Sequence, residues 1–159
     1  MYIDALEFLE EERDAWAPFE ALAGLSDDEL AAPVAEAHGW SGRDLMGHLL
    51  AWQQVALDTA KELAIGETSA TRERIDREWE TRGGDVINAE LVTSWAARPM
   101  DEVREAFRTL PGELRGYLTV VPETRWLKNA RFQRVFHADM TGHYEEHAAD
   151  LAAILDAGR

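Results

Sequence analysis

The sequence predicts an all-α fold: a four-helix bundle with a long crossover between its second and third helices. Apolar residues recur at the three- and four-residue spacing of amphipathic helices over four long stretches of the 159-residue chain. The only hint of extended structure, in residues 120–127, is too short for a sheet. The connection between Ile65 and Asp101 is too long for a tight turn, so it can cross the end of the bundle and leave the second and third helices parallel.

The first two helices carry recognisable start and stop signals. We expect the first helix over residues 3–23, with a kink or a break near Ala17 because Pro18 clashes with the preceding turn of a regular helix. Ser41 is a capping residue, and Asp44 stands at the third helical position that follows it. This pattern predicts a second helix over residues 41–65, which a glycine then ends.

The second half of the chain is less regular. We expect a mobile crossover with one helical piece around residues 70–80, followed by a short helix that ends near Trp95. The third helix should begin near residue 101 and end before Pro122, with a kink or a staggered start caused by Pro111. The last helix is expected over residues 132–158.

Composition limits the classes of partner. A net charge of −15 argues against nucleic acid and against an anionic membrane surface, because lysine and arginine drive binding to phosphates. There is no cysteine, and no apolar stretch approaches the length of a membrane span. The acidic N-terminus does not resemble a signal peptide. We therefore expect a single domain over residues 1–159, located in the cytoplasm.

Three histidines are the candidate chemical site. His143 and His147 are four residues apart in the last predicted helix, so they share one face, and the apolar neighbours on that face turn it toward the core. Imidazole suits zinc, nickel, copper and iron, and such a pair can chelate one ion. His48, on the inner stripe of the second helix, is the best candidate for a third ligand. Three histidines would leave coordination positions open, as in catalytic metal sites.

Other interpretations of these residues remain open. Each histidine can instead be a core residue whose nitrogens are satisfied by hydrogen bonds. Glu146 can lie at the edge of the metal site and act as a base, or it can be a surface carboxylate. His38 is expected on the surface, and His137 points about 120° away from His143 around the helix. The six tryptophans are expected in the core or lining a pocket.

Two stretches of the chain resemble a known family. Residues 39–52, GWSGRDLMGHLLAW, resemble the start of the second helix in the DinB-like superfamily of bacterial four-helix bundles. Residues 141–147, TGHYEEH, resemble the last-helix motif of that superfamily. The match is closest to its maleylpyruvate-isomerase-like and colibactin-resistance-like branches, and residues 85–90, DVINAE, also look like the second of these.

The resemblance implies a fold, a cofactor and a class of chemistry. It implies an up-down-down-up bundle, often a homodimer, and a divalent metal, commonly zinc or nickel, on His48, His143 and His147. Characterised relatives include transferases and isomerases that use the thiols mycothiol or bacillithiol, while the colibactin-resistance-like branch opens a cyclopropane in a genotoxin.

Two functional hypotheses follow. The first is a metal-dependent enzyme for transfer of a low-molecular-weight thiol, or for isomerisation or hydrolytic detoxification of an electrophile, with Glu146 taking the proton. The second is a non-catalytic protein that binds or sequesters a small molecule in the bundle.

Overall fold

The structure, a computed structural model, describes residues 2–159, and over this range the chain is all-α. No strand occurs within residues 2–159, so the predicted all-α class is confirmed. The α-helices are α1 (Ala5–Trp16), α2 (Asp27–Ala31), α3 (Gly42–Ile65), α4 (Ala70–Arg82), α5 (Gly84–Ala96), α6 (Met100–Val120), α7 (Ala130–Asp139), α8 (Thr141–Glu146) and α9 (Ala148–Ala157). The 3₁₀ segments are η1 (Ala17–Gly24), η2 (Ala35–Ala37) and η3 (Glu123–Arg125).

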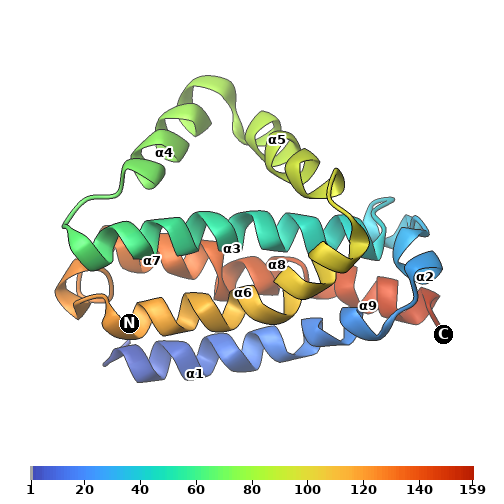
Figure 1. The fold of residues 1–159 in the computed structure, drawn as a ribbon, viewed down its shortest axis with the longest axis horizontal. Helices are drawn as coiled ribbons and strands as arrows, with labels where there is room; N and C mark the ends of the chain where they lie inside the picture. The colour runs from blue at the N-terminus through green and yellow to red at the C-terminus, as the bar shows by residue number, and fades with distance from the viewer. Residues whose placement is uncertain (1) are drawn as a thin grey trace.

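The long helices form a body from which two helices stand away. In Figure 1, α1, α3, α6 and the series α7, α8 and α9 lie lengthwise beside one another. Helices α4 and α5 rise from them as an arch, which we define as residues 66–99, and which connects α3 to α6. The helical piece predicted around residues 70–80 is α4, and the short helix predicted before Trp95 is α5.

A large apolar core holds the long helices together. Its fully or almost fully buried side chains come from all the described α-helices except α4, from η1, and from the segment of residues 121–127 between α6 and α7. They include Trp16, Phe107, Trp126, Phe136 and Tyr144. A smaller cluster fixes the arch on α3: Trp52 and Val55 of α3 pack against Ile75 and Ile87 of the arch. Burial of each such side chain contributes about 1.5–3 kcal/mol, so the smaller cluster holds the arch less firmly than the main core holds the long helices.

The predicted start signals and arginine side chains secure the helix ends. Ser41 and Asp44 form a reciprocal capping box at the start of α3. At the other end of α3, the guanidinium of Arg125 donates to the carbonyl oxygen of Leu63 at 3.1 Å. Arg43 similarly donates to the carbonyl of Ala96 at 3.2 Å, where α5 ends. These contacts satisfy carbonyls that have no partner inside their own helix.

The two interior prolines have different effects. At Pro18 the α-helix ends and the chain continues as η1, so the expected change near Ala17 is confirmed. Pro111, in contrast, lies buried inside α6, which begins at Met100 and runs unbroken to Val120. Of the two alternatives expected at Pro111, the staggered start is therefore wrong, because the apolar stripe of α6 packs on both sides of the proline, and the kink stays a prediction.

The single last helix predicted over residues 132–158 is also wrong. The chain there forms α7, α8 and α9, with breaks at Met140 (φ −120°, ψ −102°) and at His147 (φ −101°, ψ 6°). Gly142 makes the first break possible, since a Cβ at this residue would lie 3.1 Å from the carbonyl oxygen of His137. The second break falls on a candidate metal ligand.

None of the helices within residues 2–159 has both the length and the apolar character needed to cross a membrane.

Candidate metal centre

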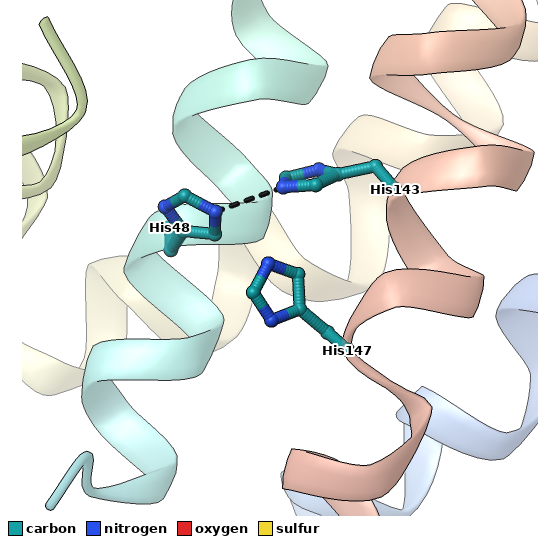
Figure 2. Close-up of side chains that lie close together, drawn as sticks. All are labelled: His48, His143 and His147. Carbon is teal, nitrogen blue, oxygen red and sulfur yellow. Dashed lines mark hydrogen bonds between the residues drawn. The ribbon is translucent and has the colours of Figure 1, made fainter. Parts of the chain in front are cut away.

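The three predicted histidines converge in the structure. His48 comes from α3, His143 from α8, and His147 from the junction of α8 and α9 (Figure 2). One ring nitrogen of each lies within 4.8 Å of the others, and the Nε2 atoms of His48 and His143 are 2.8 Å apart. His48 and His143 are buried, while the His147 side chain is 15% exposed. The cluster therefore lies at the edge of the core rather than on the surface.

Local structure before α3 shapes one wall of this cluster. His38 and Gly39 adopt positive φ angles of 59° and 81°, and the chain turns back so that Trp40 faces the histidines. The Trp40 ring stacks on His147 at 5.5 Å between ring centroids and meets His48 edge-on at 5.0 Å. Trp40 thus restricts the orientation of two of the three imidazoles.

Asp150 orients the third imidazole. Its Oδ2 lies 2.9 Å from Nδ1 of His147, and its Oδ1 lies 3.0 Å from Nδ1 of His38. A carboxylate at Nδ1 favours the tautomer in which Nδ1 carries the proton and Nε2 keeps its lone pair. The Nε2 atom of His147 is then free to act as a ligand. His38 is exposed, as predicted, and among residues 2–159 its side chain forms a hydrogen bond with Asp150 alone.

Burial keeps the other two histidines neutral. Desolvation, together with the positive charge that the neighbouring imidazoles can carry, lowers the pKa of His48 to about 4 and that of His143 to about 3. Neutral imidazole is the form that binds metal, so both rings are ready to act as ligands at neutral pH.

The donor set can hold a divalent ion once the three ring nitrogens, which lie within 4.8 Å of one another, have moved to about 3.3 Å apart. Two nitrogens on a tetrahedral zinc, at bond lengths of about 2.0–2.1 Å, lie about 3.3 Å apart. The Nε2 atoms of His48 and His143 would therefore separate by about half an ångström from their distance of 2.8 Å. Nδ1 of each ring is buried, with no hydrogen-bond partner among residues 2–159. Three imidazoles are nonetheless a nitrogen-rich site of the kind that zinc and nickel prefer.

The histidines open into a cavity of about 1000 Å³ between α3, the arch and the helices α7 and α8. Glu146 is exposed and lines this cavity, whereas Glu145 does not. His137 is exposed and is not part of the cluster. Among the tryptophans, Trp52 lines the cavity, while Trp16 is in the main core. The Glu146 side chain can therefore contact a molecule that is bound in the cavity, and its role as a base stays a prediction.

Tyr144 points away from the cavity into the core. Its hydroxyl donates to Oε1 of Glu12 at 3.0 Å and accepts from Nε2 of Gln53, also at 3.0 Å. Glu12 is fully buried and also accepts a hydrogen bond from Arg115. These hydrogen bonds hold a face of α8 about 100° around the helix from His143, so they fix the rotation of α8 and with it the direction of His143.

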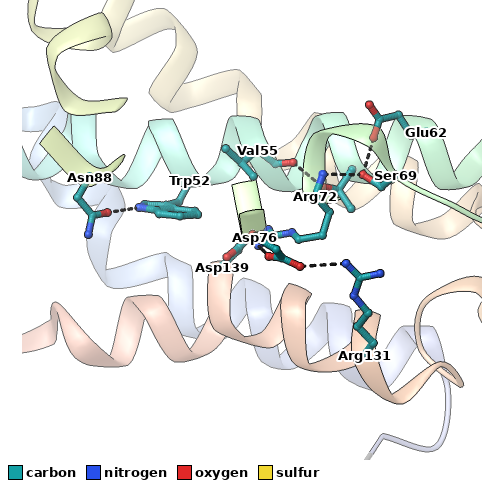
Figure 3. A network of polar contacts seen from close by, with 10 residues as sticks. Trp52, Val55, Glu62, Ser69, Arg72, Asp76, Asn88, Arg131 and Asp139 are labelled. Carbon is teal, nitrogen blue, oxygen red and sulfur yellow. Dashed lines mark hydrogen bonds and ion pairs between the residues drawn. The ribbon is translucent and has the colours of Figure 1, made fainter. Parts of the chain in front are cut away.

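A second polar group ties the arch to α7 (Figure 3). The buried Arg72 of α4 forms an ion pair with the buried Asp139 of α7. Asp76 accepts from Arg131 at 2.9 Å and lies 3.6 Å from Arg72. Burial raises the pKa of Asp139 to about 6, although the Arg72 guanidinium opposes this rise. The cavity wall on the arch side is thus held by charges as well as by apolar contacts.

Sequence reasoning missed several residues of this site. Asp150 could have been found, because it lies three residues after His147 and such pairs are neighbours on a helix. Trp40 is next to the recognised motif, but nothing in its spacing indicates that it stacks on His147. Arg72 and Asp139 are 67 residues apart and have no pattern in common.

Comparison with known proteins gives one family. No curated protein and no solved structure matches the chain. The model of the mycothiol maleylpyruvate isomerase N-terminal domain matches residues 9–152, a range that contains all three histidines. With its all-α fold and its histidine cluster, the chain belongs to this family, which is part of the DinB-like superfamily.

Proposed function

We propose that this protein is a divalent-metal-dependent enzyme that transfers a low-molecular-weight thiol to an electrophile, or otherwise isomerises or hydrolyses a reactive compound. The observation that carries the proposal is the convergence of His48, His143 and His147 beside a cavity of about 1000 Å³. A structural histidine cluster buried without a cavity would not support chemistry. The family name, which refers to mycothiol, supports a thiol as the co-substrate, with bacillithiol as the alternative.

The residues of the chain have separate roles in this proposal. His48, His143 and His147 would hold the ion, and the contact of Asp150 with Nδ1 of His147 would leave Nε2 of that ring available as a ligand. The ion supplies Lewis acidity that makes a thiol or a water nucleophilic near neutral pH. Glu146 lines the open side and accepts the proton that this nucleophile releases. Trp40 covers one face of His147 and limits access of bulk water.

Several wider features belong to the same proposal. The up-down-down-up order of the bundle, a homodimeric state and a cytoplasmic location are implied by the resemblance or expected from composition. Zinc and nickel are both compatible with three imidazole ligands.

Metal content tests the proposal. Protein purified without a nickel column should contain close to one zinc or nickel per chain, or should take up one on titration. The His143→Ala variant should bind far less, whereas His137→Ala, which changes an exposed histidine outside the cluster, should bind as the wild type does. Metal well below one per chain, with no uptake of either ion, would refute the proposal.

A second candidate function is non-catalytic binding of a small molecule. The size of the cavity and its tryptophan walls favour it, because a pocket of this kind can hold an apolar compound without chemistry. The two candidate functions predict different results when His143 is replaced. Its replacement by alanine should abolish turnover in the enzyme and leave ligand affinity almost unchanged in a binding protein. Thiols screened with electrophilic acceptors, with and without metal, provide the assay.

A further inference from the structure

The cavity beside the histidines has aromatic walls. Trp40, Trp52 and Trp79 line it from three segments: the loop before α3, α3 itself, and the arch. The Trp52 and Trp79 rings meet edge-on, with centroids 5.9 Å apart and an interplanar angle of 67°, so they form a corner. Trp52 is fixed by donating to Oδ1 of Asn88 at 2.8 Å, whereas Trp79 is 45% exposed. A flat apolar group can lie in this corner against both rings.

The positive charges of the cavity wall are already balanced. Arg72 is the one lysine or arginine among the described residues that line the cavity, and it pairs with Asp139 and lies near Asp76. Arg131, outside the cavity, pairs with Asp76 as well. The two guanidinium charges of Arg72 and Arg131 are therefore balanced by the two carboxylates of Asp139 and Asp76. Nε of Arg72 is buried and has no partner within residues 2–159, but the charge of its guanidinium is already balanced by Asp139.

Three carboxylates of the wall remain without a cationic partner. Asp44, Asp85 and Glu146 line the cavity, and none of them forms an ion pair with another described residue. Asp85 and Glu146 are exposed, and Asp44 is partly buried in its capping box. They come from α5, α8 and α3, so the negative charge surrounds the cavity instead of lying on one side. An ion on the histidines would offset only part of it.

We propose that the acceptor substrate of this cavity is a planar apolar compound that carries a positive charge, such as an alkylammonium group, beside its electrophilic centre, and that the cavity disfavours carboxylates. That the bound compound reacts as an acceptor rests on the proposed function. That the cavity prefers a cationic compound does not rest on it. A cation gains from the unpaired carboxylates and from the faces of the tryptophan rings. A carboxylate would find no unpaired lysine or arginine among the described residues of the wall, and three like charges would repel it, so an ion on the histidines would be its one source of attraction.

Calorimetry with three matched probes tests this selectivity. The probes are 1-naphthylmethylammonium, 1-naphthylmethanol and 1-naphthylacetate, which share a ring and differ mainly in charge. Titrations on zinc-loaded and on chelator-treated protein should give the same order, with the ammonium compound bound at least about tenfold more tightly than the carboxylate. Equal or tighter binding of the carboxylate in the zinc-loaded protein would overturn the inference.

Variants locate the origin of the preference. The double variant Asp85→Asn and Glu146→Gln should lower the preference for the ammonium probe over the alcohol by about fivefold or more. Asp14→Asn changes an exposed carboxylate on α1, away from the cavity, and should leave the preference intact. If Asp14→Asn lowers it equally, the preference reflects the net charge of −15 of the whole chain, and the inference is wrong.

The same data separate this inference from the proposed function. A protein that takes up no zinc but prefers the ammonium probe would refute the metal enzyme and support the substrate class. A protein that binds one zinc on the histidines but prefers the carboxylate probe would support the metal centre and overturn the substrate class.

Discussion

Acidification should destabilise the metal-free protein through His48 and His143. Burial lowers the pKa of His48 to about 4 and that of His143 to about 3, from 6.5 for an unperturbed imidazole. Between these values the unfolded chain binds more protons than the native state, so the free energy of unfolding falls as the pH falls. The contribution is fully present above about pH 6.5 and is lost progressively as the pH falls through the two native pKa values.

The magnitude follows from the same values. At about pH 5 each imidazole in the unfolded chain is protonated about thirtyfold over its neutral form, while both native imidazoles are still mostly neutral. This difference corresponds to about 2 kcal/mol for each residue and about 4 kcal/mol for the pair. A total stability of about 5–15 kcal/mol makes this loss easy to measure.

Asp139 acts in the opposite direction. Its pKa is raised to about 6 from 3.8, so the native state takes up a proton that the unfolded chain does not hold. Protonation of Asp139 therefore stabilises the protein by about 1.4 kcal/mol at about pH 5. A comparison between variants that both retain Asp139 removes this effect.

Urea unfolding, followed by circular dichroism in excess chelator at about pH 7.5 and about pH 5, provides the measurement. Between the two pH values, a variant with His48→Leu and His143→Leu should lose about 4 kcal/mol less than the wild type. His137→Leu, which removes an exposed histidine, should behave as the wild type does. If the double variant loses as much stability as the wild type, burial of these imidazoles is not the cause.

Four further predictions concern the metal and the polar groups around it. Excess chelator should lower the melting temperature at about pH 7.5, and the drop should shrink toward pH 5, where protons have already displaced the ion. Asp150→Asn should weaken zinc binding by about 10–100-fold in a competition titration with a zinc indicator, because His147 loses the acceptor that fixes its tautomer. Arg72→Met should cost about 3–5 kcal/mol in urea unfolding, since it leaves Asp139 buried without its partner, and adding Asp139→Leu should restore most of the loss. Tyr144→Phe should cost about 1–3 kcal/mol in the same assay, because it removes a buried hydroxyl that donates one hydrogen bond and accepts another.

Each of these has an outcome that contradicts it. A chelator effect of equal size at both pH values would place the metal on ligands other than imidazole. Unchanged zinc affinity in Asp150→Asn would mean that the carboxylate does not orient His147. No recovery of stability when Asp139→Leu is added to Arg72→Met would show that the buried pair is not the source of the loss. A Tyr144→Phe variant as stable as the wild type would remove the argument that this hydroxyl secures α8.

The sequence predicts the helices with capping residues and a regular apolar stripe, and it predicts the members of the histidine cluster. Helix α3 follows its signals because Ser41 and Asp44 act locally. The break at His147 could not be predicted, since no proline or glycine marks it and it accompanies a contact with Asp150. The same is true of Pro111, whose effect depends on packing and not on its own preference.

The existence and the lining of the cavity could be predicted less well than the helices. His48 and His143 face each other because apolar periodicity turns both inward, and this periodicity is legible in the chain. The opposite wall depends on how residues 66–99 fold back over α3. That arrangement rests on the ion pair of Arg72 with Asp139 and on the contact of Trp52 with Asn88, which join distant segments. Pairings of this kind leave no local pattern to read.

The arch has a consequence for how the sequence of such a protein can evolve. The histidines belong to the long helices, whereas Trp79 and Asp85 belong to one continuous stretch inserted between α3 and α6. Part of the selectivity is thus carried by a separate piece of chain, while Trp52 and Glu146 belong to the long helices. This stretch can diverge at its exposed positions at modest cost to folding, provided that the buried pair of Arg72 with Asp139 and the apolar contacts with α3 are kept. A library confined to it would redirect the protein to new compounds while the ligand set stays untouched.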